Sequence, residues 1–325
     1  MRSVSILAIP VLVAGICFCS CSQQSPEPAF QGDSLRLLYW NIQNGMWDGQ
    51  GDNYDRFVDF VRAEDPDVCV WCEAQSIYKT DSDETLPSSE RYLTANWTEL
   101  AARYGHRYWA AGGHRDNYPQ VITSKYPIGV KLKTTGDSKF VVSHGAGWFT
   151  VDAGGKTLNI VSLHLYPQSY AFGATDKEKS TAENGGDKYR AQEIRYICEH
   201  TIGTVPTASD ELWMMMGDFN ARSRVDNATY KYPEDSPKFL VHDYVRGNTP
   251  YLDVIAERNP GKFISSTGGT SRIDYIYCTK PLYDRITKAQ IIKDSYTTPV
   301  RDPKKLSNFY HPSDHLPILV DFDLK

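Results

Sequence analysis

Positive charge is the first thing this sequence has little of. It contains 35 lysines and arginines against 40 aspartates and glutamates, a net charge of −5, and no run of basic residues stands out. Proteins that hold long duplexes through many phosphate contacts need a surplus of positive charge. The sequence therefore does not indicate tight, sequence-independent duplex binding, and a local basic groove stays open as an alternative.

Cysteine is also scarce, with seven among 325 residues, three of them near the N-terminus. Cys69 and Cys72 form a C-x-x-C pattern inside an apolar run that predicts a strand. Residues three apart in a strand are about 10 Å apart and point to opposite faces. A disulfide needs Cα atoms within roughly 7 Å. We interpret both cysteines as buried apolar residues, because the partner ligands of a zinc or thioredoxin-like site are missing.

The N-terminus lacks the pattern of a folded or membrane-spanning segment. Arg2 is followed by a mostly apolar stretch, 4–18, that is short and interrupted by proline and glycine. Cys21 then follows a small residue and precedes polar sequence, which resembles a bacterial lipoprotein signal. We predict a signal peptide at 1–21 with lipid attached to Cys21, and a flexible tether at 22–34. A secretory signal cut by an ordinary peptidase is the alternative.

The rest of the chain reads as one α/β domain, 35–325. The sequence is 41% hydrophobic and 23% charged, which is ordinary for a globular protein, and it shows no repeats. The predicted strands are 35–41, 68–72, 119–124, 128–132, 140–152, 156–165, 212–216, 272–278, 286–292 and 316–322. The predicted helices are 54–64, 91–104, 188–200 and, as a short one, 251–257, whereas 221–248 is expected to be mostly irregular. Helices placed between groups of strands favour two packed sheets with helices outside.

The stretch Leu212 to Asn220, L-W-M-M-M-G-D-F-N, is the strongest local signal. Its first five residues are bulky and apolar on both alternating faces, which predicts a strand covered on both sides. Gly217 ends the run, and Asp218 and Asn220 follow at once. A carboxylate there can bind a hard cation or accept a proton from water. An ordinary Asp/Asn turn after a strand is the alternative.

Other polar residues share this position at the end of an apolar strand or just before one. They are Asn41, Glu73, His164, Asp218, Asn220, Asp274, Asp314 and His315. If these strand ends meet at one rim, four carboxylates would repel one another unless a cation or a histidine lies among them. Oxygen ligands without cysteine indicate Mg²⁺ or Mn²⁺ rather than zinc. The two histidines suit phosphate contact and proton transfer.

Six short motifs, in this order along the chain, resemble the endonuclease/exonuclease/phosphatase superfamily. They are Y-W-N-I at 39–42, D-V-C-V-W-C-E at 67–73, S-L-H-L at 162–165, G-D-F-N at 217–220, R-I-D-Y-I at 272–276 and S-D-H-L-P-I at 313–318. The superfamily includes deoxyribonuclease I-like nucleases, abasic-site endonucleases, sphingomyelinases and inositol-polyphosphate 5-phosphatases. The resemblance implies its four-layer sandwich, in which two mixed or antiparallel sheets are flanked by helices.

The resemblance also implies roles for the residues at the strand ends. Glu73 would be the main metal ligand, with help from Asn41 and with Asp314 supporting the metal side. Asp218 would orient or deprotonate the attacking water.

Asn220 would hold the scissile phosphate. His315 would contact a phosphate oxygen while Asp274 fixes its tautomer. His164 matches the branch of the superfamily with a second phosphate-facing histidine.

Plainer interpretations stand beside three of these roles. His164 can be a satisfied interior histidine, Asp314 can cap the turn into the last strand, and Asp274 can be a structural acid. The segment 166–186, with its aromatic residues and glycines, matches no nuclease segment. It leaves the choice of substrate open.

The sequence as a whole predicts a metal-dependent phosphoester hydrolase. The first substrate class is a phosphodiester, either nucleic acid or a lipid headgroup, and a phosphomonoester of the inositol-phosphate type is the alternative. A catalytically silent surface lipoprotein that binds glycans is the rival from another class. The protein is expected to be a monomer without an obligate protein partner, exported and held by lipid at the periplasmic or surface face of the bacterial cell envelope.

Overall fold

The computed structural model describes residues 32–80, 82, 84–90, 95–116, 118–152, 155–167, 186–301 and 309–325. The predicted signal peptide, Cys21, nearly all of the predicted tether and most of the segment 166–186 lie outside these residues. No helix within the described residues is both long enough and apolar enough to cross a bilayer.

The central strands are apolar on both faces because each sheet is covered on both sides. In the first strand Leu37 and Tyr39 belong to one buried cluster, and Leu38 and Trp40 to another. Side chains alternate between the faces of a strand, so one set fills the space between the sheets and the other meets the outer helices.

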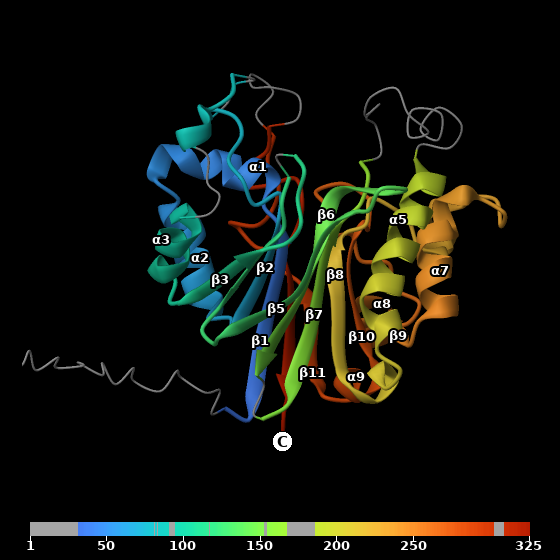
Figure 1. Ribbon diagram of the computed structural model, residues 1–325. Coiled ribbons are helices and arrows are strands. Elements are labelled where there is room, and N and C mark those ends of the chain that lie inside the picture. The colour runs from blue at the N-terminus through green and yellow to red at the C-terminus, as the bar shows by residue number, and fades with distance from the viewer. Residues whose placement is uncertain are drawn as a thin grey trace, which may run out of the picture.

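Within the described residues, twelve strands form two six-stranded sheets (Figure 1). The first sheet has the order β11 (Ile286–Ile291), β12 (Ile318–Asp323), β1 (Ser34–Asn41), β2 (Val68–Cys72), β4 (Val121–Ser124), β3 (Tyr108–Ala111). The second has the order β5 (Ile128–Gly136), β6 (Val141–Asp152), β7 (Thr157–His164), β8 (Leu212–Asp218), β10 (Asp274–Thr279), β9 (Tyr251–Asp253). Each sheet has one parallel pair at its centre, β1–β2 and β7–β8, and its other neighbours are antiparallel.

Helices cover the outer faces and complete four layers. In Figure 1, α1, α2 and α3 lie on one side of the paired sheets, and α5, α7 and α8 lie on the other. In the part of the chain that the structure describes, the α-helices are α1 (Gln43–Met46), α2 (Asp55–Glu64), α3 (Ala95–Arg103), α5 (Asp187–His200), α6 (Asn227–Tyr230), α7 (Leu240–Asn248), α8 (Val254–Arg258) and α9 (Lys280–Tyr283). The 3-10 helices are η1 (Trp47–Asp52), η2 (Ser88–Glu90), η3 (Ile202–Thr204), η4 (Ala208–Asp210), η5 (Arg224–Asp226) and η6 (Pro237–Phe239). The predicted four-layer sandwich is confirmed.

Two local predictions were wrong. The segment 221–248, expected to be irregular, contains the helix α7, whose Val241 and Val245 lie one turn apart and are fully buried. The expected helix 251–257 begins as the strand β9, which pairs with the edge of β10, and only then becomes α8. A free edge on a neighbouring strand offers hydrogen bonds that local periodicity does not reveal.

The interpretation of the C-x-x-C pattern is confirmed. Cys69 and Cys72 are free, fully buried and on opposite faces of β2, in separate apolar clusters. The Sγ atom of Cys72 donates to the carbonyl oxygen of Leu163, 3.3 Å away in the facing sheet.

Close packing of β7 on β8 explains the glycine that precedes Asp218. A Cβ atom at Gly217 would lie 2.0 Å from the carbonyl oxygen of Leu163. No side chain fits at that distance, so a glycine is required where β8 delivers Asp218 to the rim.

Candidate active site

The site lies at one rim of the two sheets, where the parallel pairs end. His164 is the register partner of Asp218 on the adjacent parallel strand, and Asp274 is its partner on the antiparallel strand β10. In the first sheet Asn41 is the last residue of β1, and Glu73 follows the end of β2. Because these strands meet at the same rim, side chains from both sheets lie close together there.

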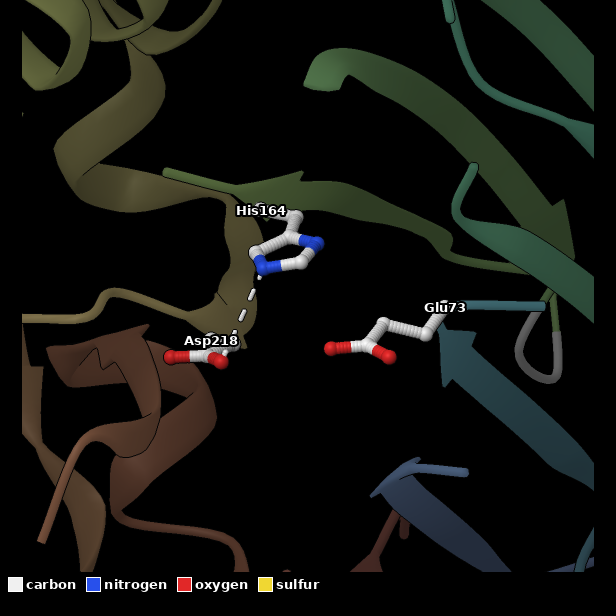
Figure 2. Close-up of side chains that lie close together, drawn as sticks. All are labelled: Glu73, His164 and Asp218. Atoms are coloured by element: carbon white, nitrogen blue, oxygen red, sulfur yellow. Dashed lines mark ion pairs between the residues drawn. The ribbon is translucent and has the colours of Figure 1, made fainter. Parts of the chain in front are cut away.

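Asp218 is the centre of this group. Its Oδ2 atom lies 3.2 Å from Asn41 Nδ2, 3.7 Å from His164 Nε2 and 3.9 Å from His315 Nε2. Figure 2 shows Glu73 reaching toward Asp218 from the opposite side, with His164 beside them. Ligand atoms of Glu73, His164 and Asp218 lie within 4.8 Å of one another.

Glu73 is held by two donors from the segment around the end of β1. The backbone N–H of Asn44 donates to its Oε2 at 3.0 Å, and Asn41 Nδ2 donates to its Oε1 at 3.2 Å. Glu73 has a φ of 54°, and Asn220 has a φ of 49°. Left-handed backbone at residues other than glycine costs about 1 kcal/mol or more. Backbone strain of this kind persists only where the surrounding structure holds the residue in place. Here it occurs at Glu73, after the end of β2, and at Asn220, after the end of β8.

His315 is oriented by a buried carboxylate. Its Nδ1 atom lies 2.7 Å from Asp274 Oδ2. The same carboxylate accepts hydrogen bonds of 2.8 Å from Tyr39 Oη and from Ser266 Oγ. With both carboxylate oxygens occupied, Nδ1 of His315 carries its proton toward Asp274, and Nε2 faces Asp218.

Asn220 and Asp314 complete the set of eight residues that the sequence predicts. The backbone N–H of Asn220 donates to Asp218 Oδ1 at 2.8 Å, and its Nδ2 donates to the carbonyl oxygen of Leu165 at 3.1 Å. Asp314 has a side chain that is 40% exposed, with Oδ1 3.8 Å from His315 Nε2. The structure thus gathers all eight residues at one rim, with Asp314 reaching the group through His315.

Burial and mutual repulsion dominate the electrostatics of the acids. Loss of water, followed by the charge of Asp274, raises the pKa of Asp218 from 3.8 to about 8. Loss of water and the charge of Asp314 raise the pKa of Glu73. Burial and repulsion therefore favour the neutral form of both acids in the absence of a cation.

The two histidines are shifted in opposite directions. His164 has a pKa well below its usual value because of burial, with added repulsion from His144 and His315. For His315, burial alone would lower the pKa, but the charges of Asp274 and Asp314 raise it well above the usual value. One imidazole is therefore neutral and the other is a cation in the absence of metal.

The donor set fits a hard divalent cation. The acids gather within reach of one ion, and a cation would offset the burial and the repulsion that raise the pKa values of Glu73 and Asp218. Cys72, the nearest thiol on these strands, is turned to the Leu163 carbonyl and offers no soft ligand. Asn41 departs from the expectation, because its Nδ2 faces the acids while its Oδ1 accepts from the Gln43 N–H at 3.1 Å.

Sequence reasoning missed several residues that support the site. Tyr39 lies two residues before Asn41, so strand alternation places both on the same face and could have identified it. Ser266 lies in a connecting segment, and Asn44 lies in the short helix α1 and acts through its backbone N–H. A residue that acts through its backbone N–H, as Asn44 does, leaves no pattern in the sequence, because every residue other than proline carries that donor.

Comparison with known proteins identifies the family of the chain. The family model described as "Endonuclease/Exonuclease/phosphatase family" matches residues 38–315. The chain belongs to this family. Its members are phosphoester hydrolases, so the chain is an enzyme of that broad class. A search of curated proteins found no match.

Solved structures of the same fold come from distant relatives. An AP endonuclease from Archaeoglobus fulgidus is similar with a TM-score of 0.57 and 15% identity, over 89% of this chain and 99% of that one. An endonuclease/exonuclease/phosphatase from Beutenbergia cavernae has a TM-score of 0.57 and 17% identity, over 90% and 72%. A humanized D. rerio TDP2 has a TM-score of 0.53 and 14% identity, over 90% and 99%. Identities this low establish the shared fold alone.

The raised pKa of Asp218 predicts how stability depends on pH in metal-free protein. Between pH 4 and 8 the unfolded chain ionises Asp218, whereas the folded chain keeps it protonated up to about pH 8. The folded state therefore loses stability as pH rises through that window. In chelator-treated protein, Asp218→Asn should melt roughly 5 °C above the wild type at pH 8 and show a clearly smaller difference at pH 5.

Thermal unfolding followed by circular dichroism at both pH values measures this difference. Asp235→Asn is the matched control, because Asp235 is exposed and lies in the connection between α6 and η6. A gain from Asp218→Asn that is equal at pH 5 and pH 8 would contradict the assigned shift.

Proposed function

We propose that this enzyme is a divalent-metal-dependent phosphodiesterase in which Asp218 activates the attacking water. One observation carries the proposal: Asp218 is buried at the meeting point of Asn41, Glu73, His164 and His315, with their donor and acceptor atoms a few ångströms away. Phosphoester hydrolysis needs a positioned water, neutralised phosphate oxygens and help for the leaving oxygen. The rim offers a residue for each.

The metal would be held by Glu73, with Asp314 and Asn41 beside it. Mg²⁺ or Mn²⁺ bound there would neutralise charge on the phosphate and on the surrounding acids. In the observed orientation of the Asn41 amide, its nitrogen donates to Glu73 and Asp218, and its oxygen does not face the proposed metal position. Direct ligation by Asn41 would require its amide to turn over.

The chain's own residues would then divide the proton and phosphate work. Asp218 is buried beside Asn41 and His164, where its carboxylate can accept a proton from water. Asn220 and His164 would hold nonbridging oxygens. His315 would donate from Nε2 to a phosphate oxygen in its cationic form, in which Asp274 accepts the Nδ1 proton.

Nucleic acid is the leading substrate class, followed by a phospholipid or sphingolipid headgroup. The similar AP endonuclease acts, by its name, on a nucleic acid. The net charge of −5 and the absence of a basic run favour a short or single-site contact over a long duplex interface. A phosphomonoester of the inositol-phosphate type is the alternative substrate, and a silent glycan-binding protein is the rival function.

Replacement of Asp218 tests the proposed function. With Mg²⁺ or Mn²⁺, the wild type should hydrolyse bis-p-nitrophenyl phosphate and at least one member of a panel of single-stranded DNA, abasic duplex DNA, RNA and sphingomyelin. Asp218→Ala should lower kcat by about 10³-fold because a base within reach of the water is lost. Asp235→Ala, a change at an exposed site, should keep the wild-type rate.

The same assay with chelator separates the alternatives. Chelation should abolish turnover, and re-added Mg²⁺ or Mn²⁺ should restore it. Turnover of p-nitrophenyl phosphate alone would favour the phosphomonoesterase. Full activity in Asp218→Ala would remove Asp218 from the mechanism, and inactivity toward every phosphoester would favour the binding protein.

We also propose that the mature protein is a lipoprotein of the bacterial cell envelope, anchored through Cys21. Support comes from the signal-like sequence before Cys21 and the polar stretch after it. In a bacterial host, full-length protein should take up an alkyne-labelled fatty acid and sediment with membranes. Cys21→Ser should lose the label, whereas Cys198→Ser, at a buried helix position, should keep it. Labelling that survives in Cys21→Ser would place the anchor elsewhere.

A further inference from the structure

A third histidine lies directly behind the site, and no motif identified it. His144 is in β6 and is 3% exposed. Its ring stacks on the ring of His164, with centroids 4.2 Å apart and an angle of 30° between the planes. Tyr118 packs edge-on against both rings, at 5.2 Å and 6.3 Å. His164 is thus held between an aromatic cluster and Asp218.

The ring of His144 is itself fixed by a carboxylate. Its Nδ1 atom lies 2.5 Å from Asp116 Oδ2, and Asp116 Oδ1 accepts the backbone N–H of Tyr118 at 3.0 Å. A carboxylate with both oxygens engaged allows the imidazole little rotation. The same arrangement, an imidazole Nδ1 on a held carboxylate, recurs at His315 and Asp274 on the other side of Asp218.

The backbone around His144 is fixed as well. Gln120 Nε2 donates to the carbonyl oxygen of His144 at 3.1 Å. The buried carboxylate of Glu193 accepts the N–H of Ser143 and the N–H of Tyr166, both at 2.7 Å. Glu193 thereby ties the residue before His144 to the segment that follows His164. Filling space alone would not require a buried histidine held by the polar side chains of Asp116, Gln120 and Glu193. This arrangement therefore indicates that the orientation of the His144 ring matters.

His164 has a geometric task that requires this support. It is the last residue of β7, and its Nε2 is 3.7 Å from Asp218 Oδ2, too far for a hydrogen bond that would fix the ring. A stacked ring constrains the tilt of His164 where Asp218 does not. Catalytic rates fall steeply when a group that contacts the reacting phosphate is displaced by an ångström.

We propose that His144, held by Asp116, is a positioning residue that stacks on His164 and aims its Nε2 at the phosphate site beside Asp218. The expected effect on the rate rests on the proposed function. The expected effect on the orientation of His164 rests on the stacked geometry alone. His144 acts through its ring face, and Asp116 acts by fixing the plane of that ring.

Three variants of the full chain test this role with bis-p-nitrophenyl phosphate and Mg²⁺ or Mn²⁺. His144→Ala removes the stacked ring and should lower kcat by about 10- to 100-fold while KM changes less than threefold. His144→Phe keeps a ring of similar shape and should recover kcat to within about fivefold of the wild type. Asp116→Asn should give an intermediate kcat, because the ring stays but loses its charged anchor.

The second readout is independent of metal and of turnover. In chelated protein, the ring-proton NMR signals of His164, assigned by their loss in His164→Ala, should be shifted upfield by the stacked ring. They should move downfield in His144→Ala and stay close to the wild-type position in His144→Phe. Thermal unfolding of each variant identifies any that do not fold, and Asp116→Asn, at a partly exposed side chain, then carries the test.

Several results would overturn the inference. Unchanged kcat in His144→Ala, or unchanged His164 signals in that variant, would show that stacking does not orient His164. Equal losses in His144→Phe and His144→Ala would assign the effect to a nitrogen of His144 rather than to its ring. A wild type without diesterase activity would end the proposed function, and the NMR comparison would still decide the positioning.

Discussion

The crowding of buried carboxylates around Asp218 is the constraint on which this structure depends. Glu73, Asp218 and Asp274 approach one another from three strands, and loss of water raises the pKa values of the first two. Carboxylates that converge in this way would drive the rim apart if all were charged. The amide of Asn41, the N–H of Asn44 and the cationic His315 offset part of that cost, and a divalent cation would offset most of the remainder.

The fold supplies the site in two halves, one from each sheet. The parallel pair at the centre of the first sheet ends in Asn41 and Glu73, and the pair at the centre of the second ends in His164 and Asp218. Contacts across the interior hold the halves in register: Tyr39 Oη reaches Asp274, and Cys72 Sγ reaches the carbonyl of Leu163. The geometry of the chemistry therefore depends on the packing of one sheet against the other.

Much of this organisation could be predicted from the sequence, because an apolar strand that ends in a polar residue can be recognised from a few neighbouring residues. Glu73 and Asp218 were found in that way, and the order of the six motifs gave the fold. His144 lies inside a strand, so its place beside His164 depends on a pairing between strands that no local pattern reveals. The helix α7 was missed because its buried face is short, with Val241 and Val245 among polar residues.

The central claim is that the crowded acids form a metal centre, and an anomalous diffraction map of crystals soaked in Mn²⁺ tests it most directly. The account predicts the strongest peak about 2.2 Å from a carboxylate oxygen of Glu73, on the side facing Asp218, and the loss of that peak in Glu73→Gln. A map with ordered Mn²⁺ elsewhere on the protein, and none between Glu73 and Asp218, would contradict the account.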